Sequence, residues 1–261
     1  MTNDFQLVSR YAADSLNLNT NDLGCEYFYM SLPLCIIDAV FSIGVNYLST
    51  KNTVNRYCSF FNLPKFSLIR EEFENNENTT FGLMPYPDKS YQESITDFVA
   101  KFSEFSPSKF ASDVFQNQQR TSTHNGILKA EAVRDFSIAL QKNGVNYFQD
   151  LASPADIQTI EKDLLKIKGQ GSGISKKYFW MLSGDKNQIK PDRMVCRFVE
   201  RAIGRPKVSI KDAEYIISGA YDILKIQYNT LNLRLLDYKI WNFQRDDELK
   251  KAPNFIKPNG S

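Results

Sequence analysis

Apolar side chains recur along most of the chain at intervals close to 3.6 residues, the spacing of an amphipathic α-helix. Residues 32–48, LPLCIIDAVFSIGVNYL, are almost entirely apolar and carry Pro33 near their start, where a helix tolerates proline. Residues 49–64 follow, with Ser49 as a favourable N-cap, and stop before Pro64. The sequence therefore predicts two consecutive helices, of which the first is buried.

The same periodicity, together with helix end signals, predicts a series of further helices. They cover 91–105, 129–144, 153–169, 174–183 and 192–204, with two more in 209–245. Residues 68–90 interrupt the series, because they are first acidic and Asn-rich and then rich in proline and glycine. Few segments alternate between polar and apolar residues, as a half-buried strand would. The predicted fold class is all-α.

Three of these helices carry specific signals. Ser153 is the predicted N-cap of 153–169, with Pro154 at the first helical position. Asp192 is the predicted N-cap of 192–204, and Gly204 its C-terminal stop. Helix 129–144 is predicted to bury one face, made of Ala132, Val133, Phe136 and Leu140.

The segment KIKGQGSGISKKYF, residues 166–179, places three glycines at every second position between two predicted helices. A helix that ends and restarts at once leaves backbone N–H groups without intrahelical partners, and these can bind an anion. Closely spaced glycines also let the backbone approach a phosphate. The alternative is a turn that only joins two helices of a bundle.

The distribution of charge favours an anion site. The formal net charge of the whole chain is only +2. Residues 161–211, however, hold 13 Lys and Arg against 5 Asp and Glu, a net of +8, and the other residues hold 19 against 25, a net of −6. A basic segment on an acidic body is typical of a polyanion-binding protein. A lysine-rich helix face exposed to water remains the alternative.

Composition excludes several classes of protein. The 261 residues, 42% of them apolar, suit one large hydrophobic core or two modest ones. No apolar run approaches the roughly 20 residues that a transmembrane helix needs, and the polar start lacks the apolar stretch of a signal peptide. We therefore expect a soluble cytoplasmic protein, nucleoid-associated if its source is bacterial, without a membrane partner.

The sequence gives little support for metal chemistry. The four cysteines include no CxxC pair, and His124 is the single histidine. These spacings disfavour a zinc or iron–sulfur site. We predict no metal and no required cofactor, and we interpret the cysteines as small apolar residues of the core.

The order of motifs after the glycine segment resembles the helix-hairpin-helix (HhH-GPD) DNA glycosylases of the endonuclease III superfamily. Helix 174–183 ends at Gly184, a polar loop follows, and PDRMVCR opens the next helix at Pro191 and Asp192. In that family a hairpin of the form Leu-Pro-Gly-Val-Gly and a second helix precede a Pro/Val-Asp element in the same order. Earlier segments fit as well: 32–61 is similar to the family's LLIAVLLSAQ helix pair, and 126–140 to its GLYNKKAEYIIELA helix.

The resemblance covers roughly residues 32–204 and implies a two-lobed helical fold. Residues 1–31 and 205–261 would form a lobe from the chain termini, and 32–204 a barrel-like region that contains the hairpin. It further implies a monomer that binds double-stranded DNA in base-excision repair and flips a damaged nucleotide out of the duplex. The hairpin would hold the DNA backbone, together with a structural monovalent cation. Its predicted DNA-binding residues are Lys168, Gly169, Gln170, Gly171, Ser172, Gly173, Lys176 and Lys177.

The resemblance also implies a catalytic residue. Asp192 stands where the family has an invariant aspartate, which stabilises the oxocarbenium-like sugar or activates the nucleophile as the base departs. Asp192 as a plain N-cap is the alternative, and one residue can serve both purposes. Candidates for stacking on a flipped base, or for filling the gap it leaves, are Tyr27, Phe28, Tyr29, Asn46 and Tyr47. Residues 178–180, also aromatic, are interpreted mainly as core.

Departures from the family pattern limit the activity. Gly173 stands where lyases carry a nucleophilic lysine, so a monofunctional hydrolase is favoured over a lyase. Lys168 and Gln170 replace the usual proline and valine of the hairpin. A non-catalytic DNA-binding protein of the same fold therefore remains an alternative, as does a helical scaffold that binds other proteins.

Overall fold

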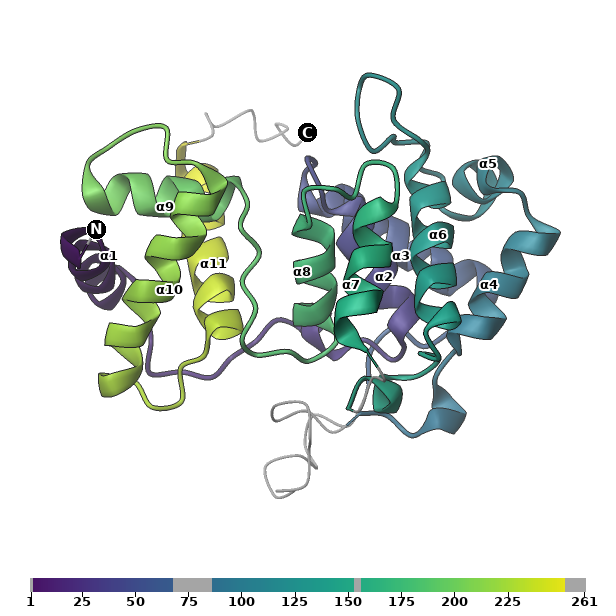
Figure 1. The fold of residues 1–261 in the computed structure, drawn as a ribbon, viewed down its shortest axis with the longest axis horizontal. Helices are drawn as coiled ribbons and strands as arrows, with labels where there is room; N and C mark the ends of the chain where they lie inside the picture. The colour runs from purple at the N-terminus through teal and green to yellow at the C-terminus, as the bar shows by residue number, and fades with distance from the viewer. Residues whose placement is uncertain (1, 68–85, 153–155, 252–261) are drawn as a thin grey trace, which may run out of the picture. The chain divides into compact units, whose positions relative to one another are not determined.

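A computed structural model describes residues 2–67, 86–152 and 156–251. Across these residues the chain forms eleven α-helices and no β-strand, so the predicted all-α class is confirmed (Figure 1). The chain divides into two compact units. One consists of residues 24–190, and the other combines the described parts of segments 1–23 and 191–261.

The unit of residues 24–190 is built around α2 (Leu32–Phe41), whose ten residues are all buried. Helices α3, α6 and α8 pack against α2. The helices that follow α2 in this unit are α3 (Tyr47–Phe61), α4 (Ile95–Glu104), α5 (Pro107–Lys109), α6 (Lys129–Lys142), α7 (Ile157–Lys166) and α8 (Ile174–Leu182). Short 3-10 or π turns complete it at Cys25–Phe28, Lys89–Tyr91, Phe110–Val114 and Phe148–Ala152.

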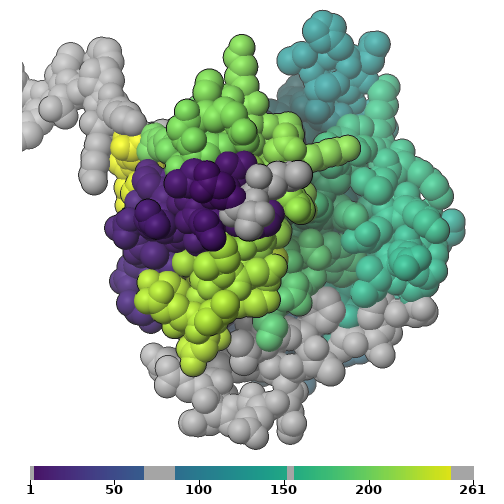
Figure 2. Space-filling model, turned by 60° about the vertical axis from the view of Figure 1, so that its left-hand side comes forward, coloured from purple at the N-terminus to yellow at the C-terminus, as the bar shows by residue number. Residues whose placement is uncertain are grey.

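The unit made from the chain ends contains four helices. They are α1 (Thr2–Ser15), α9 (Arg193–Ile203), α10 (Ile210–Gln227) and α11 (Leu233–Lys251). Helix α1 packs against α10 and α9, and Figure 2 shows its purple surface beside the green and yellow-green segments of the same unit. The prediction placed α9 with the hairpin, whereas in the structure α9 packs with α1, α10 and α11.

The predicted boundary between the first two helices was wrong. Helix α2 ends at Phe41, seven residues before the expected end, and α3 begins at Tyr47. The Lys129 ammonium donates to the carbonyl oxygens of Phe41 (2.9 Å) and Ile43 (2.8 Å), which satisfies groups at the end of α2. Gly44 then adopts a left-handed φ of 71°, a conformation that glycine tolerates and a helix does not contain.

The predicted N-cap of the second helix was also wrong. Asn46, not Ser49, is the N-cap of α3, and its side chain accepts from Leu48 N (2.9 Å). Ser49 lies inside the helix. Both residue types are good N-caps, so local sequence could not decide between them.

Later helices follow the prediction more closely. In α6 the four residues of the predicted apolar face are buried. Helix α7 begins at Ile157 with Asp156 as its N-cap, which accepts from Thr159 N (3.1 Å). The expected cap Ser153 and its neighbour Pro154 lie outside the described residues. Helix α9 begins after Asp192 and ends at Gly204, as predicted.

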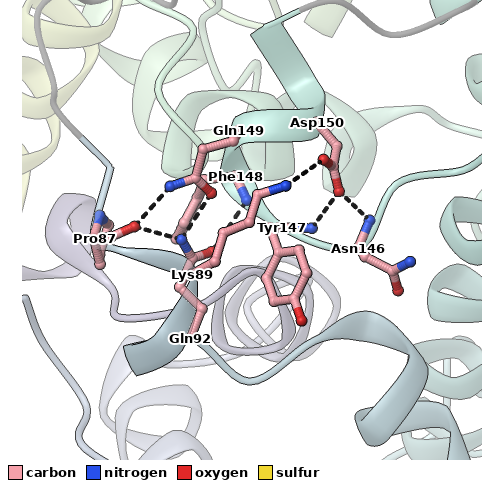
Figure 3. Close-up of polar contacts among 8 residues, drawn as sticks. All are labelled: Pro87, Lys89, Gln92, Asn146, Tyr147, Phe148, Gln149 and Asp150. Carbon is pink, nitrogen blue, oxygen red and sulfur yellow. Dashed lines mark hydrogen bonds and ion pairs between the residues drawn. The ribbon is translucent and has the colours of Figure 1, made fainter.

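A network of polar contacts holds the segment after α6 against residues 86–92 (Figure 3). The buried Gln92 side chain donates from Nε2 to Pro87 O (2.6 Å) and Gln149 Oε1 (2.9 Å), and its Oε1 accepts from Phe148 N (3.1 Å). Gln149 Nε2 also donates to Pro87 O (2.7 Å). Both polar atoms of the Gln92 side chain therefore have partners inside the protein.

Candidate functional site

The glycine segment forms a tight hairpin between α7 and α8. Gly169 and Gly173 adopt left-handed φ values of 86° and 72°, which explains glycine at both positions. A Cβ on Gly169 would lie 2.3 Å from the Cβ of Thr121, so the turn also approaches a neighbouring loop closely. Two of the glycines are therefore required by the fold itself, whether or not the hairpin binds DNA.

Gln170 anchors the hairpin from inside. Its side chain is buried, and its Oε1 accepts a hydrogen bond from the Ser175 hydroxyl. Its backbone N donates to Ile167 O (2.9 Å), and its carbonyl accepts from Gly173 N (3.0 Å). The backbone N–H and the side-chain oxygen of Gln170 thus both serve the hairpin itself, and a contact of Gln170 with DNA stays a prediction.

Several backbone N–H groups of the hairpin have no acceptor within the part of the chain that the structure describes. Ile174 N donates weakly to the Ser172 hydroxyl (3.5 Å), and Lys177 N donates to Gly173 O (3.0 Å). The N–H groups of Gly171, Ser172, Ser175 and Lys176 donate no hydrogen bond to any described residue. This is the arrangement that binds anions at helix N-termini.

The predicted lysines differ in their surroundings. Lys168 is exposed beside the turn. Lys176, in contrast, is only 14% exposed and forms an ion pair with Glu161 (2.7 Å), which also accepts from Trp180 Nε1 (3.2 Å). Lys177 is half-buried. The ion pair of Lys176 with Glu161 thus links the first turn of α8 to α7.

Ion pairs reduce the charge of the basic segment 161–211. Cations of the segment that pair with carboxylates of the described residues include Lys166 with Asp163 (2.7 Å), Lys176 with Glu161 (2.7 Å), Arg201 with Asp247 (2.5 Å) and Arg205 with Asp4 (3.4 Å). Asp163 and Glu161 are already counted in the net of +8, so only the pairs of Arg201 and Arg205, with carboxylates outside the segment, offset that charge further.

Asp192 lies at the start of α9, in the unit made from the chain ends. Its Oδ1 accepts from Met194 N (2.7 Å) and Val195 N (3.4 Å), so the N-cap prediction is confirmed. Its Oδ2 accepts no hydrogen bond from any residue that the structure describes. One carboxylate oxygen holds the helix and the other is not used by the fold, and the catalytic role of Asp192 stays a prediction.

A second polar cluster, which we call the Asp38 cluster, lies in the core of the unit of residues 24–190. Asp38 is fully buried on α2. Its Oδ2 accepts hydrogen bonds from the hydroxyls of Tyr29 (2.8 Å) and Tyr47 (3.3 Å). Its Oδ1 is buried and has no hydrogen-bond partner in the described chain. Lys190 is near enough for its charge to act on Asp38, and its Nζ donates to the Ser42 hydroxyl (3.1 Å).

Burial controls the ionisation of the Asp38 cluster. It raises the pKa of the Asp38 carboxyl to about 6, even though the charge of Lys190 and the bond from Tyr29 act in the opposite direction. The nearby Glu26 adds to the increase. Burial, followed by the charge of Asp38, also raises the pKa of the Tyr29 and Tyr47 hydroxyls, which therefore stay protonated and serve as donors. A carboxyl group with a pKa near 6 can bind or release a proton close to neutral pH.

The five residues predicted as a base pocket or wedge lie in two segments, one just before α2 and one at the start of α3. Asn46 caps α3 through its side chain, and Phe28 is the last residue of the short 3-10 turn Cys25–Phe28, which also contains Tyr27. Tyr29 and Tyr47 come together on Asp38, although 18 positions separate them in the chain. The aromatic residues of α8 are buried, as predicted for core.

The sequence analysis missed Asp38 and Lys190. A signal for Asp38 existed, because it is the only charged residue in the apolar run 32–48. A charge in a fully apolar helix is costly unless it is paired or functional. No comparable signal marked Lys190, whose Nζ lies 3.8 Å from the centre of the Tyr178 ring.

Metal and membrane sites find no support in the described ranges. They contain no group of three or more His, Cys, Asp or Glu side chains placed to hold a metal ion. No helix within them is long and apolar enough to cross a membrane. A monovalent cation at the hairpin stays a prediction.

Comparison with known proteins identifies a family without assigning a function. A family model described as "Domain of unknown function (DUF8548)" matches residues 6–245. The chain belongs to this family. The DUF8548 match covers both compact units and includes the hairpin, Asp192 and the Asp38 cluster. No curated protein and no solved structure matches the chain.

Proposed function

We propose that the protein binds duplex DNA through the hairpin of residues 166–177 and belongs functionally with base-excision repair. The observation that carries the proposal is a group of four hairpin N–H donors, at the N-terminus of α8, that have no acceptor among the residues the structure describes. Phosphate groups bind at such positions because the N–H dipoles and the helix dipole both favour an anion. The exposed Lys168 adds positive charge at the same turn.

The proposal includes a monofunctional glycosylase activity. Asp192 would stabilise positive charge on the sugar while the N-glycosidic bond breaks, using the oxygen that the helix cap leaves unoccupied. Gly173 carries no amine, so no Schiff base with the sugar would form at that position. The two-lobed arrangement of the glycosylases is part of the proposal, supported by a unit that both chain ends build together.

Duplex binding is tested by fluorescence anisotropy over a salt series. Gly171 is the sharpest position for a variant, because an added Cβ would meet nothing closer than Leu165 O at 4.0 Å, and its φ is not left-handed. Gly171→Ala should therefore fold normally but obstruct an approaching phosphate. Wild type should lose affinity steeply between about 50 and 200 mM salt. Salt-independent binding, or Gly171→Ala affinity equal to wild type, would contradict the proposal.

A pair of charge variants provides the matched control. Lys168→Gln should weaken binding and lower the salt slope by about 1. Lys51→Gln removes the same charge from an exposed position of α3, outside the hairpin, and should have little effect. Equal effects of the two variants would mean that net charge, and not the hairpin, governs binding.

Base release is tested on duplexes that carry alkylated, oxidised, deaminated or mismatched bases. Asp192→Asn is suited to the test because asparagine is also a good N-cap, so α9 should keep its start. Loss of a catalytic carboxylate should lower the rate of base release by about 100-fold or more. Equal rates for wild type and Asp192→Asn would remove Asp192 from the mechanism.

A non-catalytic DNA-binding protein is the second candidate. It is favoured by the cap geometry, since Asp192 has an evident structural role in holding the first turn of α9. This alternative predicts salt-dependent duplex binding, loss of binding in Gly171→Ala, and no base release from any of the duplexes. Failure of duplex binding altogether would leave a helical scaffold for protein partners.

A further inference from the structure

Asp38 Oδ1 is a buried carboxylate oxygen without a hydrogen-bond partner among the described residues. Its residue is 0% exposed, it lies on a helix whose other nine residues are also buried, and its Oδ1 has no donor in the described chain. A buried carboxylate oxygen without a donor costs on the order of 1 to 3 kcal/mol. An amide side chain at this position would keep an acceptor for the two tyrosine hydroxyls without burying a charge.

The surroundings of Asp38 are aromatic. Tyr27 and Tyr29 are nearly completely buried, and Tyr178 of α8 is 5% exposed. Tyr178 also has the Lys190 ammonium 3.8 Å from its ring centre. Sites for planar ligands commonly combine apolar and aromatic walls with a small number of polar groups that fix orientation. The Asp38 cluster has this composition, with one acceptor left open.

The partly exposed members of the cluster mark the side from which a ligand could enter. Tyr47, Glu26 and Lys190 are half-buried, whereas Asp38 and Tyr29 are fully buried. The Tyr47 hydroxyl holds Asp38 by the longer of the two bonds, 3.3 Å against 2.8 Å. Tyr47 is also the first residue of α3, directly after the glycine turn that ends α2. Of the two hydroxyls on Asp38, that of Tyr47 thus makes the longer bond and belongs to the more exposed side chain.

Helix α8 connects this cluster to the hairpin within one compact unit. Tyr178 follows Ile174, the first residue of α8, by four positions, which is about 6 Å along the helix axis. A nucleic acid held at the N-terminus of α8 is therefore about one helical turn from the aromatic wall.

We infer that Asp38 is the recognition group for a nucleobase, whose N–H donor bonds to Oδ1 while the base lies against the tyrosines of the cluster. The inference rests on the proposed function, to which it adds a ligand class, namely bases that present an amino group. Tyr47 swings away to admit the base, and Tyr29 keeps Asp38 in position through Oδ2.

Binding of capped bases to the full chain tests the inference. The probes are 9-ethyladenine, 9-ethylguanine and 1-methylcytosine, each with an amino group and blocked at the nitrogen that joins the sugar. Isothermal titration should show saturable binding of at least one of them. The matched probe for adenine, N6,N6-dimethyl-9-ethyladenine, has no N–H donor and should bind at least about tenfold more weakly than its parent. Binding of none of the three bases would overturn the inference.

Base binding by the Asp38→Asn variant is the second test of the inference. The amide keeps an acceptor for the tyrosine hydroxyls and replaces Oδ1 by an N–H₂ donor, so affinity for the bound base should fall about tenfold or more. Unchanged affinity in the folded variant would overturn the inference. The salt series on wild type and Gly171→Ala reports separately on the hairpin: base binding without duplex binding would sink the proposed function and leave Asp38 as a site for free bases.

Discussion

Asp150 and Asp38 lie in the same compact unit, but they differ in their hydrogen-bond partners and in the direction of their pKa shifts. Asp150 accepts hydrogen bonds from Asn146 N and Tyr147 N (2.8 Å each) at Oδ2 and pairs with Lys89 (3.2 Å) at Oδ1, as Figure 3 shows. Burial alone would raise the pKa of the Asp150 carboxyl, but these three donors outweigh burial and lower it. Both oxygens of Asp150 are satisfied by the chain itself.

Asp38 has two donors on one oxygen and none among the described residues on the other. The effect of burial therefore exceeds that of the hydrogen bonds and raises the pKa of Asp38 to about 6. The difference shows that the fold can satisfy a carboxylate fully where the role is structural. The Asp150 network joins loops, whereas Asp38 keeps an open acceptor in the core. We therefore expect that replacing Asp38 raises the stability of the fold, whereas replacing Asp150 lowers it.

The largest expected effect is a gain of stability in Asp38→Asn. Between the ordinary carboxyl pKa of 3.8 and about 6, the folded protein binds more protons at Asp38 than the unfolded chain, so wild type loses stability as pH rises through this window. The asparagine variant escapes that cost, which is on the order of 3 kcal/mol at most above pH 6. Urea unfolding at pH 8 should show the gain, and at pH 4 the two proteins should nearly coincide. A loss of stability at pH 8 would make Asp38 a structural residue like Asp150.

The network beside Asp150 should respond in the opposite direction. Gln92→Ala removes three hydrogen bonds of a buried side chain and leaves Phe148 N and Pro87 O with fewer partners. The free energy of unfolding should fall by about 2 kcal/mol. Because Gln92 does not titrate, the loss should be equal at pH 5 and pH 8. A strongly pH-dependent loss would show that Gln92 acts through the charge of Asp150.

Asp150→Asn should cost about 1 kcal/mol at neutral pH, since the amide keeps one acceptor but loses the charge that strengthens the bonds from Lys89 and the backbone. The folded pKa of Asp150 is lowered, so its stabilising contribution is present above the unfolded pKa and disappears as pH falls through the folded value. The free energies of unfolding of wild type and variant, measured in urea, should therefore converge as pH falls. A stability difference that grows in acid would contradict this assignment.

The smallest expected effect is that of Tyr47→Phe. The variant removes the 3.3 Å bond to Asp38 and keeps the ring, so the free energy of unfolding should change by a few tenths of a kcal/mol. Tyr29→Phe removes the 2.8 Å bond of a fully buried hydroxyl and should cost about 1 kcal/mol. Thermal unfolding of the pair measures the difference. Equal costs would show that Tyr47 is held as firmly as Tyr29 and is not the side chain that moves.

Much of the helical framework was predictable because its signals are local. The apolar face of α6, the start of α9 at Asp192 and the glycine stop at Gly204 depend on periodicity and capping within one helix. The end of α2 has a local signal in Gly44, but it also involves Lys129, which is 88 positions away from Phe41 in the chain and could not be foreseen from local patterns. Asn46, and not Ser49, caps α3 because the turn at Gly44 lets the next helix begin at Tyr47.

By itself the sequence determined the all-α class, the positions of most helices and the left-handed glycines that join α7 to α8. These follow from forces between residues a few positions apart, namely helix periodicity, capping and backbone sterics. Only the tertiary structure decided that the Lys176 charge is paired with Glu161 and that Asp38 keeps one oxygen without a partner. The reason is physical: burial and hydrogen-bond satisfaction are properties of all the neighbours together, and the neighbours of Asp38 come from four separate parts of the chain, represented by Tyr29, Tyr47, Tyr178 and Lys190.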